Sequence, residues 1–273
     1  MKHARRYKMK IGFIGLGNMA TAMIGGMLEK KTAAAEDIIG SARTASTRDR
    51  IKEKFHIRTA ETNVQAAREA DILFLAVKPI FMSEVIEEIK ESVKKDALIV
   101  SIAAGRDLKF LKEAFGRPEL KIVRCMPNTP ALVSEGCTGV CAGEEVPREE
   151  LDKVVKLMEA FGRASIVPER LMDVVVGVSG SSPAYVFLFI EAMADGAVAA
   201  GMPRKQAYEF AAQAVLGSAK MVLETGMHPG ELKDMVCSPG GTTIQAVKVL
   251  EEKGMRGAVI DAMEACIEKS RNM

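Results

Sequence analysis

The first 168 residues alternate between short apolar runs and segments in which apolar residues recur every three or four positions. A short apolar run is typical of a buried strand, and the longer spacing is typical of a helix with one buried face. Strands separated by helices of about ten residues form a parallel, doubly wound sheet with right-handed crossovers. This pattern predicts strands at residues 10–14, 38–41, 72–77, 98–101, 121–125, 139–142 and 164–167, and helices at 19–28, 47–55, 63–69, from 82 and at 149–161.

After residue 168 the pattern changes to long, alanine-rich helical segments without strand signals. Helices are predicted at residues 184–200, 203–224, from 229, 243–252 and 256–269. The segments 184–190 and 210–216 are apolar nearly all round, as expected of helices buried between subunits. We therefore predict an α/β domain over residues 1–168, an all-α helical domain over residues 169–273, and a homodimer formed through the second domain.

A glycine turn follows the first predicted strand and opens the first predicted helix. It reads Gly15-Leu16-Gly17-Asn18-Met19-Ala20, a GxGxxA pattern. In this context Gly15 permits the sharp turn, Gly17 lets a pyrophosphate approach the backbone, and Ala20 lets the helix pack closely on the sheet. The turn favours a dinucleotide on a Rossmann-type sheet, with a purely structural turn in a flavodoxin-like sheet as the alternative.

The end of the second predicted strand indicates which dinucleotide binds. NAD enzymes usually place Asp or Glu there to hold the ribose diol. Here Ser41, Arg43 and Thr44 follow the strand, while Glu36 and Asp37 precede it, at the wrong end. A cation with hydroxyls suits a 2′-phosphate, so NADPH is favoured and NADH remains possible.

Two further strand ends face the same edge of the predicted sheet. One carries Ala76, Val77, Lys78 and Pro79, and the other carries residues 103–105. Small residues there let a cofactor lie against the backbone. Lys78 is a candidate acid, but a cation near phosphate or ribose, or a salt bridge at a helix start, is the preferred interpretation.

Charge and composition exclude several other classes of function. With 38 basic and 36 acidic residues the formal charge is +2, so we expect no nucleic-acid partner. The longest uncharged runs, residues 11–28 and 174–190, stop short of the ~20 residues of a membrane span and are interrupted by glycines, and the basic start MKHARRYKMK lacks the apolar core of a signal peptide. The five cysteines are scattered, so no metal site is expected. We predict a cytoplasmic enzyme with no membrane partner and a solvated basic tail.

The segment CSPGGTTIQAV, residues 237–247, interrupts the helical half with a glycine break. Bare amides at a helix N-terminus bind anions, and Gly240 and Gly241 let such amides point into a cavity. Thr242 or Thr243 could instead be an ordinary helix cap. Capping accounts for one hydroxyl but not for both glycines, Pro239 and Ser238, so we expect an anionic substrate here.

These segments resemble the pyrroline-5-carboxylate reductase family. PGELKDMVCSPGGTTIQAVKVLE is similar to the family signature almost position for position, and the similarity covers residues 10–270. The other blocks, in the same order as in the family, are FIGLGNM, FLAVKP, SIAAG, RCMPNTPALV, GVSGSSPAYVF, EAMADGAV and AAQAVLGSAKM. One departure is that Gly226 and Met227 stand where some members carry a polar pair.

The resemblance implies an NADPH-dependent reduction of the cyclic imine 1-pyrroline-5-carboxylate to L-proline by hydride transfer to the C=N carbon. It implies a substrate carboxylate on the amides of Gly240, Gly241, Thr242 and Thr243, with help from Ser238. The implied cofactor-binding residues, several of them already indicated by the strand ends, are Ile14, Gly15, Leu16, Gly17, Asn18, Met19, Ser41, Arg43, Asn63, Ala76, Val77, Lys78, Pro79, Ala103, Ala104 and Gly105. Active sites built from two subunits, and decamers, are also family properties.

If the imine binds in its protonated form, the reaction needs no strong acid. The Thr243 hydroxyl would then orient the ring nitrogen or relay its proton, and Thr243 is the predicted catalytic residue. His228 is interpreted as a loop residue rather than a general acid. Glu191 and Asp195, four apart on a helix, are interpreted as a solvated or interfacial pair rather than an acid–base pair.

Two alternatives remain. A two-domain NADP-dependent hydroxyacid dehydrogenase would need a lysine or histidine on the central helix 184–200, which has neither. A non-catalytic dinucleotide sensor would keep the GxGxxA turn but has no use for the SPGGTT loop. A test for NADPH oxidation with pyrroline-5-carboxylate distinguishes the reductase from such a sensor.

Overall fold

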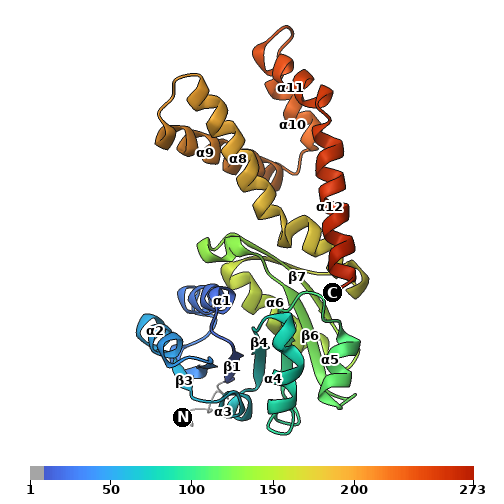
Figure 1. The fold of residues 1–273 in the computed structure, drawn as a ribbon. Helices are drawn as coiled ribbons and strands as arrows, with labels where there is room; N and C mark the ends of the chain where they lie inside the picture. The colour runs from blue at the N-terminus through green and yellow to red at the C-terminus, as the bar shows by residue number, and fades with distance from the viewer. Residues whose placement is uncertain (1–8) are drawn as a thin grey trace, which may run out of the picture. The chain divides into compact units, whose positions relative to one another are not determined.

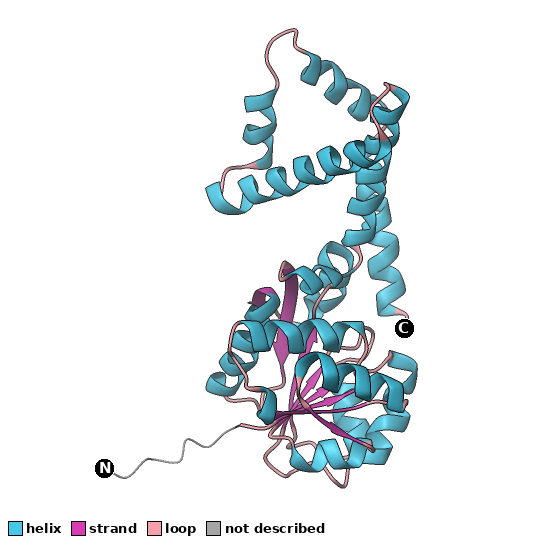
Figure 2. Cartoon of the chain, turned by 90° about the vertical axis from the view of Figure 1, so that its left-hand side faces the viewer, coloured by secondary structure: helices cyan, strands magenta, loops and turns pink. Residues whose placement is uncertain are grey.

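The computed structural model describes residues 9–273, so the predicted basic tail at residues 1–8 lies outside the described part. The chain divides into two compact units, residues 1–181 with 266–273, and residues 182–265. The first unit holds all the strands of the described chain, and the second consists of helices (Figures 1 and 2). The domain boundary expected at residue 168 stays a prediction.

Unit 1 contains one eight-stranded sheet with the strand order β3-β2-β1-β4-β5-β6-β7-β8. The chain order reverses between β1 and β4, which is the switch point at which such sheets bind ligands. The strands are β1 (Ile11–Ile14), β2 (Ile38–Ser41), β3 (Arg58–Ala60), β4 (Ile72–Leu75), β5 (Leu98–Ser101), β6 (Lys121–Met126), β7 (Gly136–Ala142) and β8 (Gly162–Ile166). The predicted Rossmann-type architecture is confirmed.

One pair of neighbouring strands corrects the expectation of a fully parallel sheet. β7 runs antiparallel to β6, with Val123 opposite Ala142, whereas the other neighbours are parallel. The connection between them holds only a 3₁₀ turn, Thr129–Val133. It is shorter than the dozen or so residues that a parallel crossover requires, so the chain turns back on itself.

Helices cover both faces of this sheet (Figure 2). Alternate strand residues enter two separate apolar clusters: Phe13 and Phe74 stack 4.7 Å apart on one face, and Leu73 and Leu75 lie on the other. The helices of unit 1 are α1 (Asn18–Glu29), α2 (Ala45–Phe55), α3 (Asn63–Glu69), α4 (Met82–Ile89), α5 (Leu108–Phe115), α6 (Arg148–Met158) and α7 (Met172–Val175).

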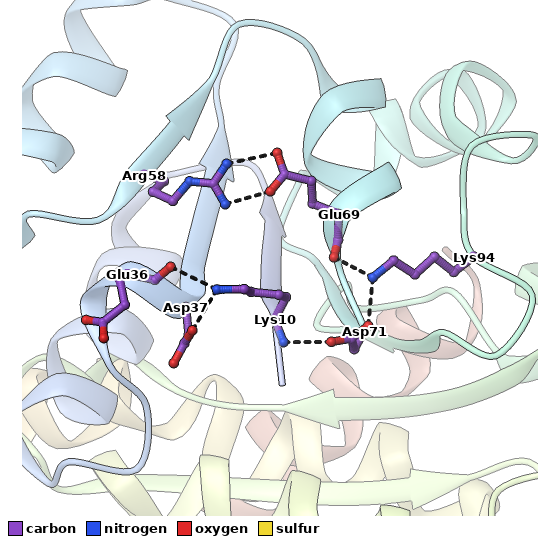
Figure 3. Close-up of polar contacts among 7 residues, drawn as sticks. All are labelled: Lys10, Glu36, Asp37, Arg58, Glu69, Asp71 and Lys94. Atoms are coloured by element: carbon purple, nitrogen blue, oxygen red, sulfur yellow. Dashed lines mark hydrogen bonds and ion pairs between the residues drawn. The ribbon is translucent and has the colours of Figure 1, made fainter. Parts of the chain in front are cut away.

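Charged residues form a network at the amino ends of the strands (Figure 3). The Lys10 ammonium contacts the Asp37 carboxylate at 2.7 Å, and the Lys10 backbone N–H donates to Asp71 at 2.8 Å. Lys94 donates to the other oxygen of Asp71 at 2.7 Å. Asp37 therefore lies at the end of β2 opposite the glycine turn, where it forms an ion pair with Lys10.

A second ion pair in the same view joins β3 to α3. The Arg58 guanidinium donates to both oxygens of Glu69, at 2.6 and 2.9 Å. These two hydrogen bonds hold the pKa of the Glu69 carboxyl below its ordinary value. Burial alone would raise the pKa of Asp71, but the bonds from Lys10 and Lys94 outweigh it and lower that pKa as well.

Unit 2 is built from helices with little apolar burial of their own. α8 packs against α9 through small residues, and only Ala194, Ala207 and Ala211 are buried in these two helices. Large side chains such as Phe187 (62% exposed) and Leu188 (67%) face outward. The helices are α8 (Ser182–Ala199), α9 (Arg204–Thr225), α10 (Pro229–Val236), α11 (Thr242–Glu252) and α12 (Met255–Arg271), whose last turns belong to unit 1.

Candidate cofactor and substrate sites

A cavity of about 600 Å³ opens at the carboxyl ends of the central strands of unit 1. This is the edge of the sheet at which ligands bind in doubly wound folds. Its wall combines cations, acids, hydroxyls and the glycine turn. The lining residues are Gly15, Leu16, Gly17, Ala42, Arg43, Thr44, Thr47, Arg50, Glu61, Thr62, Asn63, Val77, Lys78, Phe81, Glu84, Val85 and Glu88.

The glycine turn fits a pyrophosphate. Gly15 has a φ of +96°, and a Cβ there would lie 2.5 Å from the Ala76 carbonyl oxygen, so glycine is required. A Cβ on Gly17 would meet nothing within 4 Å among the described residues, so the backbone at Gly17 is open to a ligand. Within residues 18–29 the first turn of α1 carries no acid, and its N-cap makes no side-chain bond. The amides that open α1 are therefore available to an anion.

Cations lie on the wall formed by the end of β2 and by α2. Arg43 is exposed, and its guanidinium lies over the Phe81 ring, 5.2 Å from the centroid. Arg50 lies on the same wall but was not anticipated from the sequence. Its three-residue spacing from Thr47 on α2 is the signal that could have identified it, because residues three apart share a helix face. The Thr44 hydroxyl caps α2 by accepting from the Thr47 N–H at 3.3 Å.

Ser41 is buried behind this wall and does not line the cavity. Its hydroxyl donates to Asn63 Oδ1 at 2.7 Å. The Asn63 amide in turn donates through Nδ2 to a Glu88 carboxylate oxygen, also at 2.7 Å. A side chain from β2, one from α3 and one from α4 are thus joined, and two of them, Asn63 and Glu88, face the cavity.

Some of the predicted cofactor residues line this cavity and others do not. Val77 and Lys78 line it, as do Gly15, Leu16, Gly17, Arg43 and Asn63. Ile14 is a buried β1 residue whose carbonyl accepts from the Ala76 N–H at 2.8 Å. The predicted residues that do not line the cavity are Ile14, Asn18, Met19, Ser41, Ala76, Pro79, Ala103, Ala104 and Gly105.

In unit 2 the SPGGTT loop is a tight turn that leads into α11. Gly240 has a φ of +70°, and a Cβ on Gly241 would lie 2.4 Å from the Ser238 hydroxyl oxygen. The first glycine is needed for backbone conformation and the second for close approach of Ser238. The Gly241 N–H donates to the Ser238 carbonyl at 3.0 Å, so this amide is occupied within the turn.

The threonines do not cap α11. Gly241 is the N-cap and makes no side-chain capping bond. The Thr242 and Thr243 amides lie in the first turn of α11, where helical N–H groups have no intrahelical acceptor. Among residues 9–273 neither hydroxyl has a hydrogen-bond partner. Two amides and two hydroxyls are therefore available to an anionic ligand.

Two other candidates have structural roles. His228 is the N-cap of α10, where its Nδ1 accepts from the Gly230 N–H at 3.0 Å. Glu191 and Asp195 are both exposed, in line with a solvated face, and Asp195 forms an ion pair with Arg204. In the described part of the chain no group of three or more His, Cys, Asp or Glu is placed to hold a metal ion.

One helical stretch, Glu169–Ala199, is long and apolar enough to cross a membrane. Only 11% of its most apolar window is buried within this chain. Core helices of water-soluble proteins have a similar length and composition, so these two properties alone do not show that the stretch spans a membrane. The expectation of no membrane partner stays a prediction.

The glycine turn, its cavity and the switch in strand order define a dinucleotide-binding oxidoreductase with a Rossmann-type sheet and a helical second part. Residues 10–105 match the family described as NADP oxidoreductase, coenzyme F420-dependent. Residues 169–273 match the family described as pyrroline-5-carboxylate reductase dimerisation.

Full-length relatives specify the family. The chain is 54% identical to pyrroline-5-carboxylate reductase of Escherichia coli, over 97% of this chain and 98% of the relative. It is 46% identical to the Methanosarcina acetivorans enzyme over 97% of both chains. The chain belongs to the pyrroline-5-carboxylate reductase family.

Solved structures agree with this assignment. A pyrroline-5-carboxylate reductase from Coxiella burnetii matches with a TM-score of 0.90 and 36% identity, over 97% of this chain and 98% of that one. The Plasmodium falciparum enzyme, solved with NADP bound, matches with a TM-score of 0.87 and 32% identity over 97% of both chains.

Proposed function

We propose that this protein is a pyrroline-5-carboxylate reductase, which reduces the cyclic imine 1-pyrroline-5-carboxylate to L-proline with NADPH as the last step of proline biosynthesis. The observation that carries the proposal is that one chain holds both the glycine-turn cavity and the SPGGTT turn, within a match that spans 98% of the Escherichia coli relative. We also propose that the enzyme acts in the cytoplasm.

The cavity in unit 1 would hold the dinucleotide. The amides of the glycine turn and the start of α1 would bind the pyrophosphate, and Arg43 with Arg50 would bind the 2′-phosphate. No acid stands directly at the carboxyl end of β2 to repel that phosphate, because the positions there are Ser41, Ala42 and Arg43. These features support NADPH over NADH. When bound, the cofactor supplies the hydride.

The turn before α11 would hold the substrate carboxylate. The amides of Thr242 and Thr243 are unpaired donors at a positive helix end, and Ser238 lies against the same turn. The Gly241 amide already donates to Ser238, so we assign it a structural role in place of the direct contact expected from the sequence. The Thr243 hydroxyl, which makes no bond within the described chain, would bind the ring nitrogen and hold its proton in place.

We further propose that unit 2 forms a homodimer. Large apolar side chains on α8 and α9 are exposed in the single chain, including Phe187, Leu188, Phe210 and Leu216. So much exposed apolar surface is unusual for a monomer. Analytical ultracentrifugation should give a species of twice the 29.5 kDa chain mass or a multiple of it, including a decamer, and a monomer at micromolar concentration would refute this part.

An assay for the activity is direct. Purified protein, NADPH and racemic pyrroline-5-carboxylate should give loss of NADPH absorbance together with formation of L-proline. The same reaction with NADH should be slower at equal cofactor concentration. Binding of NADPH without turnover of the imine would favour the dinucleotide sensor. Oxidation of an alcohol such as 3-hydroxyisobutyrate in a separate assay with NADP⁺ would favour the hydroxyacid dehydrogenase.

A further inference from the structure

The carboxylates in the dinucleotide cavity call for a physical explanation. Glu61, Glu84 and Glu88 all line it, although a carboxylate repels the phosphates of a dinucleotide. Of these three, Glu88 is the one whose carboxylate is bonded to another residue of the wall, at 2.7 Å from Asn63 Nδ2. This bond distinguishes Glu88 from a merely solvated acid.

The Asn63 side-chain amide has two orientations of nearly equal shape. In one, the oxygen faces Ser41 and the nitrogen faces Glu88, and in the other the two are exchanged. Ser41 cannot select between them, because a hydroxyl both donates and accepts. An ionised carboxylate only accepts, so Glu88 requires the nitrogen of Asn63 to point toward it. The oxygen must then face the buried Ser41, as the structure has it.

We propose that Glu88 is a positioning residue that fixes the amide orientation of Asn63, so that Asn63 offers an N–H donor to an acceptor oxygen of the bound dinucleotide. Nδ2 has two hydrogens, and Glu88 uses one. The other remains for the cavity that Asn63 lines. Dinucleotides carry mainly acceptor oxygens along the phosphates and ribose, so a donor is the polarity that the ligand needs. This inference rests on the proposed NADPH site.

Replacing Glu88 by lysine distinguishes an effect on the orientation of Asn63 from a direct effect of charge on the cofactor. Lysine only donates, so Glu88→Lys reverses the preferred orientation of Asn63 and turns its oxygen toward the cavity. The same change places a positive charge beside an anionic cofactor. Electrostatics alone therefore predicts tighter NADPH binding, and positioning predicts weaker binding. Glu84→Lys is the matched control, because Glu84 lies on the same helix and lines the same cavity without a bond to Asn63.

The NADPH Kd is measured by titrating the fluorescence of the bound nicotinamide, together with KM and kcat. We expect Glu88→Lys to raise the Kd about tenfold, the scale of one lost hydrogen bond. Glu88→Gln should raise it about twofold, because glutamine satisfies both Asn63 orientations equally. Glu84→Lys should not raise it. The KM for NADPH should follow the Kd, while kcat at saturating cofactor changes little.

A double-mutant comparison tests whether the effect passes through Asn63. In an Asn63→Ala background, Glu88→Lys should no longer weaken binding. Tighter or unchanged binding in Glu88→Lys, or equal weakening in both backgrounds, would overturn the inference. A wild-type protein that binds NADPH but does not reduce pyrroline-5-carboxylate would refute the proposed function and leave this inference intact. Failure of the wild type to bind NADPH would remove both.

Discussion

Replacing Thr243 by valine tests the proposed catalytic role of its hydroxyl. Valine keeps the β-branched shape, so the half-buried side chain can pack as before. The hydroxyl makes no hydrogen bond within residues 9–273 and does not cap α11, so its removal should cost the fold little. The melting temperature should therefore change by no more than about 1–2 °C, because no bond of the folded chain is lost.

The effect on catalysis should be much larger. A buried hydrogen bond to the ring nitrogen contributes about 1–3 kcal/mol, so kcat/KM for pyrroline-5-carboxylate should fall about 5- to 150-fold. NADPH binding should not change. Thr242→Val is the natural comparison, because it removes the neighbouring hydroxyl and retains the amide of the same turn. Thr243→Val kinetics equal to those of the wild type, or equal losses in both variants, would refute the assignment of Thr243 to the reacting nitrogen.

Three further outcomes are expected. Arg43→Ala should raise the Kd for NADPH about tenfold and leave that for NADH nearly unchanged, because only NADPH carries the 2′-phosphate; parallel losses for both cofactors in titrations would argue against this contact. Gly15→Ala should lower the melting temperature, since alanine would need a φ of +96° and would place its Cβ 2.5 Å from a carbonyl oxygen; an unchanged calorimetric transition would contradict the strained turn. The pKa of Glu69 is lowered in the folded state by Arg58, so its contribution to stability is present above its ordinary pKa and lost as pH falls through the lower folded value. The stability deficit of Glu69→Gln in denaturant titrations should accordingly shrink below about pH 4, and a deficit independent of pH would exclude this ionisation as the cause.

Local patterns predicted those parts of the fold whose residues interact with near neighbours. β1, the glycine turn and α1 could be placed because an apolar run, a GxGxxA motif and helical spacing follow one another directly. The strand β3 (Arg58–Ala60) was not predicted, because three residues with an exposed first position carry no apolar run. The helix α5 was also not predicted, although Leu108, Leu111 and Phe115 have helical spacing and are buried.

The direction of β7 and the complete set of cavity-lining residues depend on contacts between residues far apart in the sequence, which local patterns do not predict. A strand signal has no direction, so the alternation of strands and helices predicts a parallel β7, whereas β7 pairs with β6 in the antiparallel sense. The glycine turn and Arg43 could be anticipated at strand ends, whereas Asn63, at the start of α3, was implied only by the family resemblance. Glu88 could not be anticipated, because its hydrogen-bond partner Asn63 is 25 residues away in the sequence. The pattern of α4, which carries Glu88, is that of an ordinary amphipathic helix.

The return of α12 to unit 1 affects how the two halves of the protein could be separated. Residues 266–273 belong to the same compact unit as the sheet, and the Ser270 hydroxyl donates to Asp173 at 2.7 Å. The nucleotide-binding half is therefore discontinuous along the chain, with residues 182–265 inserted into it. A fragment that simply stops at residue 181 would lack part of its own surface. Excising 182–265 and joining the two ends by a short linker would be the better way to obtain that half alone.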